Sequence, residues 1–129
     1  MILRRYMSLL GIGSAKIDLI LEKETYKPGE KVEGYFLIRG GTVEQQLKGI
    51  NCDLVVTDHE EKTETSVDTV TIFTSTRIHS EELNKVSFTF RLPETLKASA
   101  SHLSYRFKTK LTFNEGVESY DLDMIRIIE

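Results

Sequence analysis

The stretch LSYRFKTKLTF, residues 103–113, alternates between apolar and polar side chains. A period of two places successive side chains on opposite faces of a β-strand, so this stretch predicts a strand with one buried face. Thr109 is the single polar residue on the apolar face. The other face carries the cations Arg106, Lys108 and Lys110, which are therefore expected to lie in one row along the strand.

Six other stretches on either side of this one also predict strands. They are rich in the β-branched residues Val, Ile and Thr, which suit a pleated surface. One of them, residues 67–78, mixes Thr with apolar residues on both faces, so its register stays open. The last stretch, residues 122–128, is apolar on parts of both faces. This pattern indicates that it lies inside a sheet with both sides covered, or that the N-terminal segment covers it. The six are residues 15–21, 32–38, 46–58, 67–78, 86–92 and 122–128.

Seven strands separated by polar turns, with almost no helix between them, predict an all-β domain over residues 14–129. An antiparallel β-sandwich is the favoured architecture, and a barrel is the alternative. Between the first two strands, Pro28 fixes its own φ and Gly29 accepts a positive φ, so we expect a tight turn there.

Composition narrows the class of protein. The chain has 129 residues, 40% of them hydrophobic, and no apolar run reaches the length of a membrane-spanning helix. Its 17 Lys and Arg residues against 20 Asp and Glu give a net charge of -3, which argues against nucleic acid as a partner. Cys52 is the single cysteine, so the fold contains no intramolecular disulfide, and a reducing, cytoplasmic compartment is expected.

The first thirteen residues have a different pattern. Their apolar side chains recur at helical spacing, with Arg4 and Arg5 on another face, so residues 1–13 predict a short amphipathic helix and a connector. A signal peptide cleaved near Ala15 is the alternative. So short a helix needs a surface to pack on, which is its own domain, a second copy or, less favoured, a membrane. The apolar residues are Ile2, Leu3, Tyr6, Leu9 and Leu10.

No pattern of catalytic residues emerges. The three histidines are too far apart in sequence to suggest a metal motif, and no second cysteine could share a zinc ion with Cys52. Cys52 falls on the apolar face of its strand, where a buried thiol with a raised pKa is expected. Asp121 and Asp123 share one strand face and are interpreted as ordinary solvent-facing carboxylates. The sequence therefore predicts no enzyme, no metal and no cofactor.

The row formed by Arg106, Lys108 and Lys110 has two interpretations. As a functional feature it is a basic stripe that could meet an acidic protein, an anionic lipid or a phosphorylated segment. As a structural feature it is the solvated face of a half-buried strand, balanced by acidic side chains on neighbouring strands. The second interpretation is the more common one, and the first makes these residues candidates for partner binding.

Several motifs resemble those of arrestin-like N-terminal domains. TYKPGEKVEG, residues 25–34, resembles the Pro-Gly-Glu-x-Val-x-Gly turn and strand of that family. FTFRLPETL, residues 88–96, is similar to its Phe-x-x-x-Leu-Pro segment, and residues 103–111 resemble the strand that follows. A bacterial branch, the sporulation stage-zero M family of sporulation-control proteins, is closer still. That likeness lies in GIGSAKID, LEKETY, Gly40-Gly41 and LKGI, at residues 11–18, 21–26, 40–41 and 47–50.

This resemblance implies an arrestin-like, immunoglobulin-like sandwich and a non-enzymatic intracellular regulator that binds other proteins. The family carries two such domains in tandem, so the chain resembles its N-terminal half. A domain that normally packs against a neighbour exposes apolar surface when alone, so we expect self-association. The N-terminal apolar residues named above, by helix docking, and an unpaired sheet edge, by strand addition, are the two candidate contacts.

A module that binds a small ligand or a carbohydrate, either inside the cell or secreted, is the alternative function. Such a module would need exposed aromatic rings on a concave face. Most rings fall on predicted core faces, Phe73 among them, and only Tyr26, Tyr35 and Tyr120 are expected at the surface. Three tyrosines without tryptophan do not favour a sugar platform, so protein binding is the preferred prediction.

Overall fold

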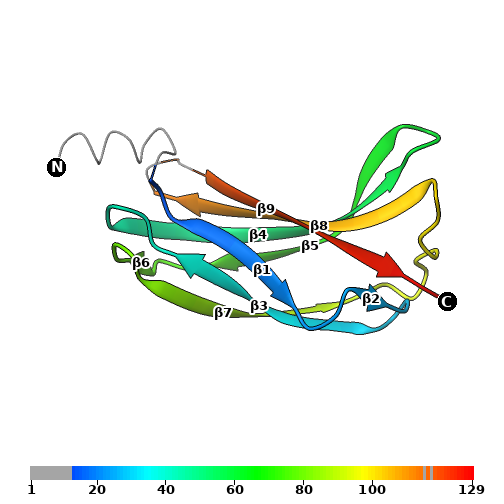
Figure 1. Ribbon diagram of the computed structural model, residues 1–129, viewed down its shortest axis with the longest axis horizontal. Helices are drawn as coiled ribbons and strands as arrows, with labels where there is room; N and C mark the ends of the chain where they lie inside the picture. The colour runs from blue at the N-terminus through cyan, green and yellow to red at the C-terminus, as the bar shows by residue number, and fades with distance from the viewer. Residues whose placement is uncertain (1–12, 115, 117) are drawn as a thin grey trace.

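The computed structural model describes residues 13–114, 116 and 118–129, and these form two β-sheets packed face to face. The strands run along the long axis of the molecule, as Figure 1 shows. The predicted β-sandwich is thereby confirmed. In the described part of the chain, no helix has the length and hydrophobicity needed to cross a membrane.

The smaller sheet has three antiparallel strands in the order β1-β3-β7. Its central strand carries the motif glycine Gly34, which lies opposite Leu21 on one neighbour and Phe88 on the other. The turn before that strand has the predicted form, because Gly29 has a φ of 80° and the Glu30 N–H donates to the Lys27 carbonyl at 3.1 Å. The strands are β1 (Lys16–Leu21), β3 (Lys31–Arg39) and β7 (Leu83–Arg91).

The larger sheet follows the order β2-β9-β8-β4-β5, with β6 paired to β4. All of its pairs are antiparallel except β2 with β9, which is parallel. A β-bulge interrupts the β4–β5 pairing at Leu54 and Val55. The strands are β2 (Thr25–Tyr26), β4 (Gln45–Asp58), β5 (Thr63–Phe73), β6 (Arg77–Ile78), β8 (Leu103–Phe113) and β9 (Glu118–Ile127).

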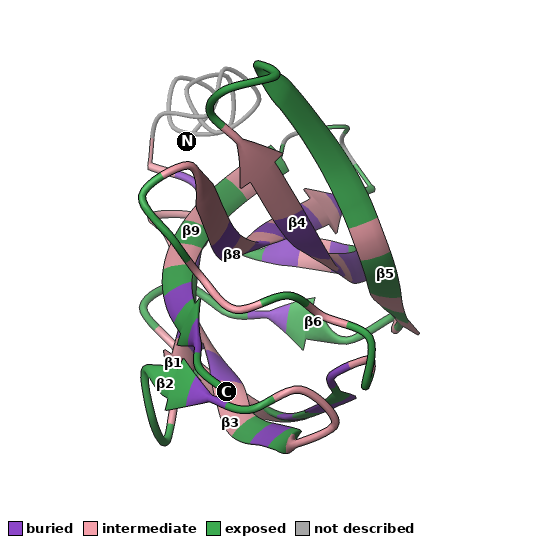
Figure 2. Ribbon diagram, turned by 90° about the vertical axis from the view of Figure 1, so that its right-hand side faces the viewer, coloured by how far each residue is buried: buried purple, intermediate pink, exposed green. Residues whose placement is uncertain are grey.

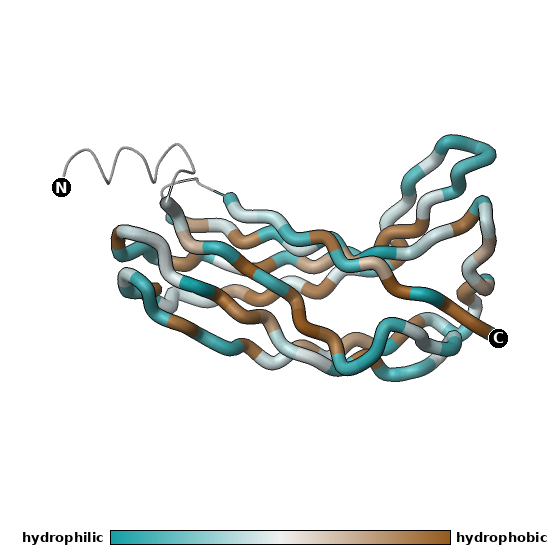
Figure 3. Tube along the Cα trace, viewed as in Figure 1, coloured by the Kyte–Doolittle hydropathy of each residue, from teal (hydrophilic) through white to brown (hydrophobic). Residues whose placement is uncertain are grey.

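The core lies between the two sheets. Buried positions concentrate on the facing sides of β3, β4 and β8, while β5 is largely exposed (Figure 2). Hydrophobic positions recur along the strands in the same alternation (Figure 3). Phe107 of the larger sheet meets Phe88 and Phe90 of the smaller one edge to face, with ring centroids 5.5 and 5.4 Å apart. Such contacts join the sheets with specific geometry as well as buried area.

Every predicted strand stretch contains a strand; the two-residue strand β2 was not predicted, and β6 was not predicted as a strand of its own. The uncertain stretch at residues 67–78 divides into the end of β5 and β6, and β5 itself begins earlier, at Thr63. The mixed pattern of β5 has a physical cause. It is an edge strand whose side chains are mostly exposed, so no face needed to be consistently apolar.

Two expectations about aromatic rings are wrong. Tyr26, expected at the surface, is 1% exposed because the short strand β2 places it against the end of β9. Phe73, expected in the core, is 87% exposed. It lies at the end of β5 opposite Gly49, in the register that the bulge establishes for that strand.

Candidate functional site

The outer face of β8 and β9 brings together a row of cations and a row of apolar side chains. Each apolar residue on β9 lies directly across from one cation on β8, in the pairs Tyr120–Lys110, Leu122–Lys108 and Met124–Arg106. The apolar side chains are 67%, 57% and 69% exposed, respectively. We call the six residues the β8–β9 outer face.

The predicted basic row therefore exists, and its three members differ in their partners. Lys108 forms an ion pair with Glu64 on β5, and Lys110 pairs with Glu118 on β9 at 3.4 Å. Arg106 instead donates from Nη2 to the Thr57 hydroxyl at 3.2 Å. Acidic neighbours thus balance two of the cations, as the structural interpretation of this row expected. Among the described residues, Arg106 makes no ion pair with a carboxylate.

A cleft of about 430 Å³ opens at one end of this face. It forms because the loop after β7 is tied to the end of β9. The Ser99 N–H donates to the Ile127 carbonyl at 2.8 Å, and the Ile127 N–H donates to the Ser99 hydroxyl at 2.9 Å. The Tyr105 hydroxyl holds the same loop by donating to the Lys97 carbonyl at 2.7 Å. The lining residues are Ser99, Ala100, Ser101, Leu103, Ser104, Met124, Ile125 and Arg126.

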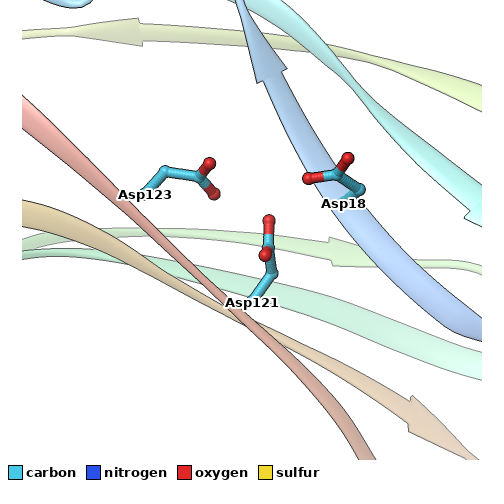
Figure 4. A group of neighbouring side chains, drawn as sticks. All are labelled: Asp18, Asp121 and Asp123. Atoms are coloured by element: carbon cyan, nitrogen blue, oxygen red, sulfur yellow. The ribbon is translucent and has the colours of Figure 1, made fainter.

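Three aspartates meet on the other side of β9, where it approaches β1. Asp18, Asp121 and Asp123 bring one carboxylate oxygen each to within 4.8 Å of one another (Figure 4). The prediction that Asp121 and Asp123 are ordinary solvent-facing residues is wrong. They lie across from the buried residues Thr109 and Phe107, on the inner face of the sheet.

Charge repulsion and burial act together on this cluster. Burial, then the hydrogen bond and charge of Asp121, raise the pKa of Asp123 to about 8, and Asp18 adds to the effect. Burial and Asp121 also raise the pKa of Asp18. Three oxygens this close could share a proton or hold a hard cation such as Mg²⁺ or Ca²⁺.

Two of the three histidines lie close together, and the third does not. The His59 N–H donates to the His102 carbonyl at 2.7 Å, and His59 Nε2 contacts the Ser104 hydroxyl at 3.0 Å. His79 instead pairs with Glu44 at 2.7 Å. Cys52 is buried as expected, and desolvation raises the pKa of its thiol to about 12. A thiol with so high a pKa carries almost no thiolate at neutral pH and is a poor nucleophile.

Neither the cleft nor the apolar row was predicted from the sequence, although the apolar row left a signal there. Leu122 and Met124 stand two residues apart on the face opposite Asp121 and Asp123, which shows that β9 is apolar toward the outside. The predicted N-terminal helix, with its candidate residues Ile2, Leu3, Tyr6, Leu9 and Leu10, lies outside the described residues and stays a prediction.

Comparisons by family model, by sequence and by structure each find the same family. The family model described as SpoOM protein matches residues 3–128. The sporulation-control protein spo0M of Bacillus subtilis (strain 168) is 31% identical over 121 residues, which is 89% of this chain and 47% of that protein. The crystal structure of Spo0M from Bacillus subtilis superposes with a TM-score of 0.83 at 28% identity, covering 92% of this chain and 51% of that one.

The chain thus spans about half the length of the relatives that it matches. The likeness in fold extends over both sheets, in agreement with the arrestin-like resemblance of the sequence motifs. With a family model matched along nearly its whole length, the chain belongs to the Spo0M family of sporulation-control proteins.

Proposed function

We propose that this chain is a non-catalytic regulator of sporulation that acts by binding another protein through the β8–β9 outer face. The observation that carries the proposal is the exposed row Tyr120, Leu122 and Met124. Burying apolar surface is the main source of affinity in protein association, and exposed apolar rows beside charged rims are typical of docking sites. Membership of a sporulation-control family supports the regulatory role.

Several features support a role without catalysis. The thiol of Cys52 is buried with a raised pKa, and His79 contacts Glu44, away from the neighbouring His59 and His102. A general base or nucleophile would have to stand within hydrogen-bond reach of its partner group in an accessible site. We infer that the protein works in the cytoplasm, which the single reduced thiol of Cys52 supports.

A module that binds a small ligand is the second candidate function, and the cleft beside Met124 favours it. Its volume of about 430 Å³ lies in the range of small-molecule sites. The apolar row extends beyond the cleft along β9, however, and a small molecule would leave most of that row uncovered. Protein binding therefore accounts for more of the exposed surface.

The proposal is tested by site-specific photocross-linking in the native host at the onset of starvation. A benzophenone amino acid replaces Leu122 in one strain and Phe73 in another, since both side chains are exposed and apolar but lie on different strands. We expect a specific covalent protein adduct at position 122 that is absent at position 73. Equal adducts at both positions, or none at position 122, would overturn the proposal.

Strains that carry substitutions at the same face allow a functional readout. The double variant Leu122→Lys/Met124→Lys should lower the yield of heat-resistant spores toward that of a deletion strain, or change it in the same direction. Phe73→Lys should leave the yield unchanged. All three positions are exposed, so their substitution should cost little stability and leave the protein level unchanged. Immunoblots of each variant check that the levels match.

A further inference from the structure

Beside the cleft, two arginines lie near one exposed methionine: Arg106, which belongs to the β8–β9 outer face, and Arg126, which extends it along β9. Arg106 lies directly across from Met124 on the neighbouring strand. Arg126 follows Met124 by two residues on the same strand and therefore points to the same side of the sheet. Met124 and Arg126 both line the cleft, together with Leu103 and Ala100.

The two arginines differ from the other cations of this face. Lys108 and Lys110 already have carboxylate partners in Glu64 and Glu118. No ion pair with a carboxylate involves Arg106 or Arg126 within the part of the chain that the structure describes. The chain as a whole carries a net charge of -3, so the positive charge at the cleft is local. A guanidinium is well suited to binding a carboxylate through two parallel hydrogen bonds.

We propose, building on the proposed function, that the partner presents an acidic–apolar peptide segment, with an apolar side chain in the cleft and flanking carboxylates on Arg106 and Arg126. Of the three serines at the cleft, the Ser99 hydroxyl already accepts from the Ile127 N–H and the Ser104 hydroxyl contacts His59, so Ser101 is the one whose hydroxyl can bind the backbone of that segment. The apolar side chain covers Met124 and Leu103, and the rest of the segment continues over Leu122 toward Tyr120.

The dimensions of the surface favour a peptide. Strand residues rise by about 3.3 Å each, so Tyr120 and Met124 are about 13 Å apart along β9. An extended segment of about five residues covers that distance, and the cleft adds room for one anchoring side chain. A peptide held in this way buries the whole row, whereas a compact ligand fills only the cleft.

An anionic membrane fits this face less well. Asp53 lies across from Lys108 on the outer side of the sheet, and Glu64 and Glu118 stand beside the lysines. These carboxylates offset most of the positive charge of the face and weaken its attraction to anionic lipids. Arg106 and Arg126 form no ion pair among the described residues, although the charge of Arg106 also acts on Glu64, so this arginine pair favours a ligand with well-placed carboxylates.

The test is selection of twelve-residue peptides from a random display library against the full chain. We expect the enriched peptides to share an apolar residue with Asp or Glu on both sides. Their affinity should fall at least tenfold in Met124→Lys and in Arg126→Glu, and it should be unchanged in Phe73→Lys, which is exposed on β5. Raising the salt concentration should also weaken binding, because the contacts are charged.

Charge reversal makes the test specific. Arg126→Glu should recover affinity for the same peptides when Lys replaces their acidic residues, and the melting temperature of each variant establishes that it is folded. Enrichment of peptides without acidic residues, or affinity that Arg126→Glu leaves unchanged, would overturn this inference. So would vesicle binding in place of peptide binding, that is, wild-type protein that binds vesicles rich in phosphatidylserine and loses this binding in Arg126→Glu, with no selective peptide binding by either. In each of these cases a cross-linked adduct at position 122 would still support the proposed function.

Discussion

The backbone N–H of Leu19 donates to Oδ2 of Asp121 at 2.8 Å, and this hydrogen bond joins β1 of one sheet to β9 of the other. The two strands run side by side along one side of the sandwich (Figure 1). The bond satisfies an edge-strand N–H that has no sheet partner of its own. It also places the acidic cluster where the two sheets meet. The charge of this cluster therefore affects the stability of the contact between β1 and β9.

Asp123→Asn should remove most of the pH dependence of stability between pH 5 and pH 8. The pKa of Asp123 rises from its ordinary value of 3.8 to about 8 in the folded protein, so the folded state holds an extra proton within that window. Stability therefore falls as pH rises from about 4 and levels off above about 8. We expect the free energy of unfolding to drop by about 1–2 kcal/mol between pH 5 and 8, with water screening part of the effect.

Urea unfolding at pH 5 and at pH 8 measures this difference. The variant should be more stable than the wild-type protein at pH 8 and similar to it at pH 5. Asp68→Asn, at an exposed position on β5, is the matched control and should keep the wild-type pH dependence. A wild-type protein that becomes more stable from pH 5 to pH 8 would contradict this account of the cluster.

Gly34→Ala should destabilise the smaller sheet strongly. A Cβ at this position would lie 2.1 Å from the carbonyl oxygen of Ile20 on β1, so the backbone of one strand would have to move. We expect a loss of about 2–4 kcal/mol in the free energy of unfolding, measured by chemical denaturation. Glu33→Ala, on the exposed face of the same strand, should change it by less than about 1 kcal/mol. Equal effects of the two substitutions would rule out the close approach at Gly34 as the cause.

Cys52 should be almost unreactive in the native protein. It is buried, the Thr109 hydroxyl donates to its sulfur at 3.5 Å, and the pKa of its thiol is raised to about 12. A thiol reagent such as dithionitrobenzoate attacks the thiolate, so labelling at pH 8 should occur only after the protein opens. The labelling rate should therefore rise by orders of magnitude in urea. Rapid labelling of the folded protein would contradict the burial.

A feature could be predicted from the sequence where it depends on residues close together in the chain. Features that depend on contacts between distant segments could not be predicted. The alternation at residues 103–113 predicted β8 and the row of Arg106, Lys108 and Lys110, because strand period alone decides which side chains share a face. The pairing of Lys108 with Glu64 was not readable, since it depends on which strands become neighbours. The same holds for the acidic cluster, in which Asp18 and Asp121 come from opposite ends of the chain.

The errors at Phe73 and Tyr26 have the same origin. A bulge in the β4–β5 pairing decides which way the end of β5 faces, and no residue pattern in β5 announced it. A strand as short as β2 has no periodicity to read, so the burial of Tyr26 follows only from its parallel pairing with the end of β9. Long, regular strands were therefore predictable, whereas pairings between distant segments were not.

Removal of residues 1–10 should lower the mass of the protein in solution if the N-terminal segment mediates self-association. The prediction rests on the helical spacing of Ile2, Leu3, Tyr6, Leu9 and Leu10. Light scattering after size-exclusion chromatography should show an oligomer for the whole chain and a monomer for the shortened one. Identical oligomeric states would contradict the prediction, and replacement of Arg4 and Arg5 by Gln is a control that keeps the apolar residues.

Tyr26 should stabilise the end of β9 and thereby the cleft beside Arg126. Its carbonyl accepts from the Ile128 N–H at 2.9 Å, and its hydroxyl donates to the Lys23 carbonyl at 2.9 Å. Tyr26→Phe removes only the hydroxyl and should cost about 1 kcal/mol in the free energy of unfolding. Tyr26→Ala also empties the site of a large buried ring and should cost about 3–5 kcal/mol.

Hydrogen exchange distinguishes a local effect from a global one. Under conditions where Tyr26→Ala stays folded, the amides of Arg126 and Ile128 should exchange faster than in the wild-type protein. They donate to the carbonyls of Glu24 and Tyr26, respectively, in the segment that the ring anchors. The exchange rates of amides in the centre of β8 should change less.

Peptides selected on the wild-type protein should bind Tyr26→Ala more weakly than Tyr26→Phe, since the cleft depends on the position of Arg126. Uniform acceleration along β8 and β9 would show instead that Tyr26 supports the whole sandwich and has no special part in shaping the cleft.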